Sequence, residues 1–86
     1  MDKSAHAKVI AFSSLDIKGC EARIERYVSS GDGETAIRLS AWRNGKALDQ
    51  PLTLSEEQLI ELLHTAAQEG VISRGFAGKL REKIEI

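Results

Sequence analysis

The sequence has little of the residue types that mark several specialised classes of protein. A single cysteine, Cys20, excludes a disulfide within the chain. Cysteines and histidines nowhere cluster at metal-ligand spacing, so we expect neither a metal site nor a cofactor. The apolar run near the amino terminus is too short for a membrane span or the core of a signal peptide. We therefore expect a soluble, cytoplasmic protein without a membrane partner.

An excess of charge of one sign is also lacking. Twelve lysines and arginines stand against thirteen aspartates and glutamates, for a net charge of -1. Duplex-DNA binders usually need a broad positive surface, so this balance argues against that class and leaves room only for a local basic patch. The hydrophobic share of 42% is ordinary for a folded protein. We expect a single domain over residues 1–86, with residues 1–7 frayed.

Three segments in the first half of the chain are predicted to be strands. Residues 8–13 contain a short apolar run, and residues 14–19 are typical of a turn. Residues 20–29 alternate apolar and polar side chains, with Arg26 as the exception on the apolar face. Helix is the alternative for this segment, because its apolar residues also lie near helical spacing. Residues 35–42 alternate in the same way and predict a hairpin with the preceding strand.

The second half begins with the clearest local signal, the dipeptide Asn44-Gly45, which favours a type I′ hairpin turn. Pro51 fits the start or edge of a further strand at residues 52–54. Ser55 followed by Gln58 predicts a capping box at the start of a helix over residues 56–69, and Gly70 is a suitable stop. Ser73 then predicts the cap of a shorter helix, in which one apolar seam recurs every four residues: Ile72, Phe76, Leu80 and Ile84.

Together these elements predict an α+β fold. We expect an antiparallel β-meander of about four strands, followed by one long and one short C-terminal helix packed on one sheet face. An exposed strand edge and the small size of the chain favour a homodimer, formed through strand edges or through the final helix.

The polar face of the central hairpin is the candidate functional surface. Aromatic rings alternating with arginines on a sheet can stack unpaired bases and hold phosphates. The residues predicted to form this single-stranded nucleic-acid site are Arg23, Tyr27, Arg38 and Trp42, with Arg43 and Lys46 at the turn. The alternative interpretation is that Tyr27 and Trp42 form a covered cross-strand pair and that the arginines only solvate the sheet.

Several short motifs resemble the positive-cofactor-four-like transcriptional coactivators and their small bacterial relatives. They are RYVS at residues 26–29, IRLSAW at 37–42, the turn, LTLS at 52–55 and Glu57-Gln58. The resemblance covers about the middle half of the chain. It implies a curved antiparallel sheet backed by a helix, dimerisation, binding of single-stranded DNA along the sheet, and a role in transcription regulation.

The sequence also allows other functions. A protein-interaction module, such as a small regulator or inhibitor of bacterial or phage type, would use the acidic helix residues Glu56, Glu57 and Glu61. A helix-turn-helix would place Arg74, Lys79, Arg81 and Lys83 on its second helix. His64 near Glu61 is the strongest acid-base pair in the sequence, yet such a histidine is usually a surface residue. We therefore expect a binding protein without enzymatic activity.

Overall fold

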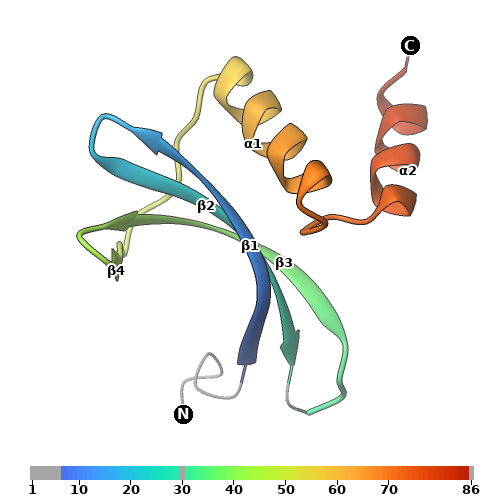
Figure 1. Cartoon of the computed structure of the whole chain (residues 1–86), viewed down its shortest axis with the longest axis horizontal. Helices are drawn as coiled ribbons and strands as arrows, with labels where there is room; N and C mark the ends of the chain where they lie inside the picture. Colours follow the sequence, from blue (N-terminus) through green and yellow to red (C-terminus); the bar gives the residue numbers. More distant parts are fainter. Residues whose placement is uncertain (1–6, 30, 86) are drawn as a thin grey trace.

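The computed structural model describes residues 7–29 and 31–85. In chain order its elements are β1 (Ala7–Ile17), β2 (Cys20–Ser29), β3 (Thr35–Arg43), β4 (Lys46–Ala47), α1 (Glu56–Gln68) and α2 (Arg74–Ile84). The four strands form one antiparallel sheet in chain order, and α1 packs on β1 and β2 (Figure 1). This confirms the predicted α+β meander with two helices after it. Both helices were expected to pack on one sheet face, but α1 does so whereas α2 lies beyond the sheet. Across the described residues, no helix has the length and apolar character needed to cross a membrane.

The first hairpin is longer than predicted. β1 continues to Ile17, so the prediction of a turn over residues 14–19 is wrong, and only Lys18 and Gly19 form the turn. Both have positive φ angles, 52° and 84°, as a two-residue type I′ turn requires. Lys18 is an unusual residue for this conformation, which is why the sequence signal was weak. Ala7, expected to be frayed, begins β1, while residues 1–6 lie outside the described residues.

β2 is a strand, so the helical alternative for this segment is wrong. Its alternation places Ala22 and Ile24 in the core beneath α1. Alternation also places Arg26 on this face, where its Nε donates a hydrogen bond of 2.7 Å to the carbonyl of Val71, just after α1. The exceptional arginine of the apolar face thus satisfies a backbone acceptor. The irregularity in strand pairing occurs in β1 instead, between Val9 and Ala11.

The second half of the sheet confirms one prediction and corrects another. Asn44 and Gly45 have φ angles of 53° and 77°, as the predicted turn requires. β4, however, contains only Lys46–Ala47, and the predicted strand at residues 52–54 is wrong because these residues have no regular structure. Pro51 immediately before them has no N–H to donate to a sheet. Leu52 and Leu54 instead pack against the core.

The capping box at α1 is present as predicted. Ser55 Oγ accepts a hydrogen bond of 3.1 Å from the backbone N–H of Gln58, whose side chain accepts one of 2.9 Å from the N–H of Ser55. Gly70 ends the helix with a φ angle of 77°. The core between α1 and the sheet contains Ala22, Ile24, Leu62, Ala66, Val71 and Ile72.

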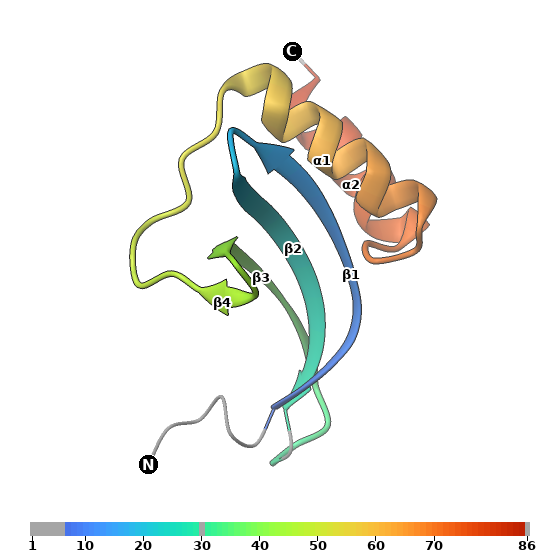
Figure 2. The ribbon, with the colours of Figure 1, turned by 60° about the vertical axis from the view of Figure 1, so that its left-hand side comes forward.

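α2 begins at its predicted cap, where Ser73 Oγ accepts a hydrogen bond of 3.0 Å from the backbone N–H of Phe76. Figures 1 and 2 show α2 beside α1, beyond the edge of the sheet. All α2 side chains are described, and none is buried. Of the predicted apolar seam, Ile72 is in the core, whereas Phe76 and Ile84 are exposed. The seam therefore leaves much of its apolar surface in contact with solvent.

Candidate nucleic-acid interface

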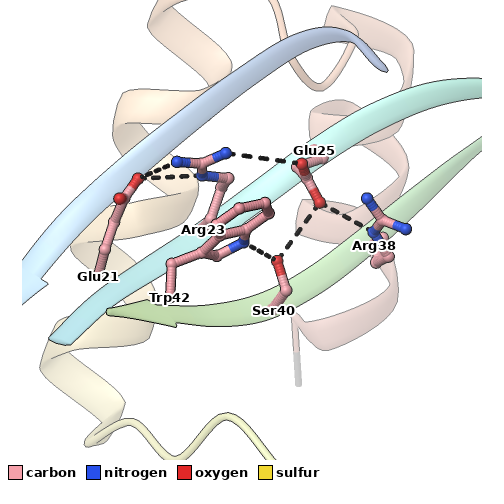
Figure 3. Close-up of polar contacts among 6 residues, drawn as sticks. All are labelled: Glu21, Arg23, Glu25, Arg38, Ser40 and Trp42. Carbon is pink, nitrogen blue, oxygen red and sulfur yellow. Dashed lines mark hydrogen bonds and ion pairs between the residues drawn. The ribbon is translucent and has the colours of Figure 1, made fainter. Parts of the chain in front are cut away.

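The candidate site lies on the sheet face opposite α1, called here the polar face. Strand register places Glu25 of β2 between Phe12 of β1 and Arg38 of β3. Alternation along the three strands then puts all four predicted sheet residues on this face: Arg23, Tyr27, Arg38 and Trp42. Figure 3 shows the polar side chains in front of the strands, with the helices behind.

Glu25 is the centre of a network of polar contacts, although its side chain is almost fully buried. The residue is 1% exposed. Its Oε1 accepts hydrogen bonds of 2.8 Å from Arg38 Nε and 3.3 Å from Ser40 Oγ. Its Oε2 lies 4.0 Å from a guanidinium nitrogen of Arg23 (Figure 3). A buried carboxylate needs compensating partners of this kind, so Glu25 joins the two arginines into one unit.

Arg23 contacts carboxylates and two aromatic rings. Glu21 accepts hydrogen bonds of 3.0 Å from its Nε and 2.7 Å from a terminal nitrogen. The guanidinium carbon lies 4.4 Å from the centre of the Phe12 ring and 4.0 Å from that of Trp42. Because Phe12 and Trp42 come from the strands on either side of β2, this cation–π contact joins all three strands.

Trp42 is held from a second direction. Its indole nitrogen donates a hydrogen bond of 2.8 Å to Ser40 Oγ, which in turn donates to Glu25. The interpretation that Trp42 and Tyr27 form a cross-strand pair is wrong, because Trp42 pairs with Glu21 and Tyr27 with Ala36. The two rings lie instead near opposite ends of the network.

Arg38 is the more accessible of the two arginines, with 40% of its side chain exposed. The hydrogen bond to the Glu25 carboxylate raises the pKa of Arg38, an effect that partial burial opposes. Arg38 therefore keeps its charge at every physiological pH. Its guanidinium carbon also lies 5.5 Å from the centre of the Tyr27 ring. Only Nε of Arg38 donates a hydrogen bond to Glu25, so the N–H groups of its two terminal nitrogens are not used by this carboxylate.

Arg43 and Lys46 stand apart from this network. They are cross-strand neighbours in the register of β3 and β4, at the base of the Asn44-Gly45 turn, and both are exposed. By strand alternation Arg43 points to the face opposite Trp42. Ion pairs among the described residues involve Arg23 and Arg38 but neither of these two. The structure thus brings four of the six predicted residues together. The other two lie at the hairpin tip, outside the ion pairs found among residues 7–29 and 31–85.

Sequence reasoning missed four residues that contact the predicted ones on the polar face: Phe12, Glu21, Glu25 and Ser40. Phe12 is 50% exposed and adds a third aromatic ring. Counting back along both strands from a Lys18-Gly19 turn places Phe12 opposite Glu25, so the correct turn would have found this pair. Alternation had already placed both glutamates on the face of Arg23. Alternation did not indicate that these glutamates form ion pairs with Arg23 and Arg38.

An open depression of about 710 Å³ adjoins this network. Its lining includes four polar-face side chains, Phe12, Arg23, Arg38 and Trp42, and it continues past Ile10 and Ala11 to Glu69 and Val71. Within the described residues, histidine, cysteine, aspartate and glutamate form no group able to hold a metal ion. The depression therefore offers two aromatic rings and two guanidinium groups as its binding chemistry, beside aliphatic side chains and the carboxylates of Glu25 and Glu69.

Comparisons of the chain with known protein families, with curated proteins and with solved structures found no match. The resemblance to positive-cofactor-four-like coactivators therefore stays a prediction.

Proposed function

We propose that this protein binds single-stranded nucleic acid across its polar face, with a role in transcription regulation. The observation that supports the proposal most strongly is the grouping of Phe12, Tyr27 and Trp42 with two arginines beside an open depression. Unpaired bases stack on such rings whatever their identity, and each stack contributes about 1–3 kcal/mol. A duplex hides its bases, so the same surface favours single strands.

The residues of the polar face divide into two roles. Arg23 is enclosed by Glu21, Phe12 and Trp42, and it holds the rings in position. Arg38 is partly exposed and uses only one nitrogen for Glu25, so it is the residue placed to contact a phosphate. Arg43 and Lys46 lie on the other face of the sheet, so they contact the nucleic acid only where a strand leaves the polar face around the hairpin tip.

The charge balance of the face determines how binding should respond to salt. Glu21 and Glu25 offset the charges of Arg23 and Arg38. Counterion release should therefore be small, with a salt dependence equivalent to roughly one to three phosphate contacts. Stacking rather than charge supplies most of the affinity, which also agrees with the net charge of -1.

The test is a titration with a mixed-sequence single-stranded oligonucleotide, at salt concentrations from about 50 to about 200 mM. Trp42 is the single tryptophan, so its fluorescence reports on the polar face alone. We expect saturable quenching that weakens modestly with salt, and much weaker binding of the same sequence as a duplex. Unchanged fluorescence, together with unchanged fluorescence anisotropy of a labelled oligonucleotide, would refute the proposal. Binding to a protein partner through the acidic α1 residues would then be tested by pull-down.

A further inference from the structure

A second surface, on the helices, is independent of the polar face. α1 and α2 enclose a groove of about 690 Å³. Both helices line it with residues at the spacing of one helical face: Ile60, Leu63 and Ala67 from α1, and Ala77, Leu80 and Ile84 from α2. Ile60 and Ile84 are each 66% exposed. We call this surface the helical groove.

α2 lacks the support that a helix of its length requires. It has 11 residues, includes Gly75 and Gly78, and buries no side chain. Isolated helices this short are marginal in water, because most helical stability in proteins comes from packing an apolar face. The exposed apolar side of α2 is therefore a surface that gains from a partner.

Charge on the two helices identifies that partner. α1 carries Glu56, Glu57 and Glu61 without any lysine or arginine. α2 carries the opposite charge on four side chains, Arg74, Lys79, Arg81 and Lys83, with Glu82 as its one acid. Arg81 lines the groove on the α2 side together with Glu85, the residue after the helix, and Glu57 lies one helical turn from Ile60 on the α1 side.

We propose that the helical groove binds the helical groove of a second copy of this chain. A two-fold axis brings α1 of each copy against α2 of the other, so that one acidic and one basic helix meet twice. The apolar residues of both grooves are buried between them, and the charges at the rim set the orientation. The interface is self-complementary, and it leaves the polar face of each copy uncovered.

The first part of the test is sedimentation equilibrium over a series of protein concentrations. We expect the wild-type chain to have the mass of a dimer and Ile84→Asp that of a monomer. Its circular dichroism should lose no more helical signal than the 11 residues of α2 contribute, because α1 and the sheet do not depend on the partner. Ile10→Asp serves as control, since Ile10 is a similarly exposed residue on the outer strand β1. A monomeric wild-type chain would overturn the proposal, as would a dimer broken by Ile10→Asp and left intact by Ile84→Asp.

The second part exchanges the charges of the helices. In one variant Glu57→Lys and Glu61→Lys make α1 basic, and in the other Arg74→Glu and Arg81→Glu make α2 acidic. For each variant alone, the dissociation constant of the dimer should rise by about tenfold or more. An equimolar mixture should form a heterodimer, because both α1–α2 contacts then have opposite charges again. Recovery in the mixture also proves that both variants are folded.

A matched control is Glu34→Lys with Asp49→Lys. It changes the charge of the chain by the same amount as Glu57→Lys with Glu61→Lys, but at exposed positions outside the groove. Its dimer should be as strong as that of the wild type. Equal weakening in this control, or no recovery in the mixture, would show that α1 does not face α2 across the dimer and would overturn the proposal.

Discussion

Arg38 donates a hydrogen bond of 2.8 Å from its Nε to a carboxylate, Glu25, that is 1% exposed. A partly exposed cation on β3 thus compensates a buried anion on β2, and Ser40 and Arg23 complete the compensation. The polar face consequently has two properties at once. Its side chains are held in fixed positions, and its net charge is close to balance.

Glu25→Gln should lower the stability of the protein and raise its affinity for oligonucleotides. Glutamine keeps the shape of the side chain but leaves two guanidinium groups without their buried counter-charge. We expect the free energy of unfolding in urea to fall by about 1–3 kcal/mol. Glu21→Gln is the control. Because the Glu21 side chain is more exposed, this substitution should lower the free energy of unfolding by less than about 1 kcal/mol. Equal losses in both variants would contradict a central role for Glu25.

Trp42→Ala should weaken oligonucleotide binding by about 1–3 kcal/mol, since it removes one stacking surface. Its unfolding free energy should fall by less than about 3 kcal/mol, the loss expected of a ring in the core. Trp42→Phe keeps an aromatic ring and should retain most of the affinity. Measurement is by anisotropy of a labelled oligonucleotide, because these variants lack tryptophan fluorescence. A large loss of stability with unchanged affinity would identify Trp42 as a purely structural residue.

Phe12→Ala tests the ring that sequence reasoning missed. Half of its surface is exposed, so the loss of stability should be small, whereas the loss of one ring against Arg23 should weaken oligonucleotide binding. Val9→Ala is a suitable control, since Val9 lines the same depression without an aromatic ring. If both substitutions weaken binding equally, general apolar contact rather than stacking explains the affinity.

Arg38→Ala should reduce the salt dependence of oligonucleotide binding by about one phosphate contact. The control is Arg26→Ala, which removes an arginine from the opposite face, where its guanidinium donates to the carbonyl of Val71. That variant should lose stability but keep the wild-type salt slope. Identical slopes for wild type and Arg38→Ala would remove Arg38 from the interface.

Ser55→Ala should lower the free energy of unfolding by about 1 kcal/mol, because it removes the side-chain acceptor of the α1 capping box. Ser14→Ala, an exposed position on β1, should change it by less than about 0.5 kcal/mol. Urea unfolding followed by circular dichroism measures both. No difference between the two variants would mean that the cap adds nothing to α1.

Local chemistry in the sequence by itself determined much of the fold. The Asn44-Gly45 turn, the Ser55 cap with Gln58, the Gly70 stop and the alternation of β2 and β3 each depend on residues only a few positions apart. Backbone preferences and short-range hydrogen bonds act at that distance, so they can be recognised before the chain is folded. The same alternation correctly placed Arg23, Tyr27, Arg38 and Trp42 on one face.

Only the tertiary structure decided what that face contains. The Lys18-Gly19 turn determines the register of β1, and through it the position of Phe12 against Glu25. Arg26 finds its acceptor on Val71, 45 positions along the chain. Which charges are paired, and which remain free, depends on contacts between strands and on burial. Those quantities arise from packing, and no local pattern of residues specifies them.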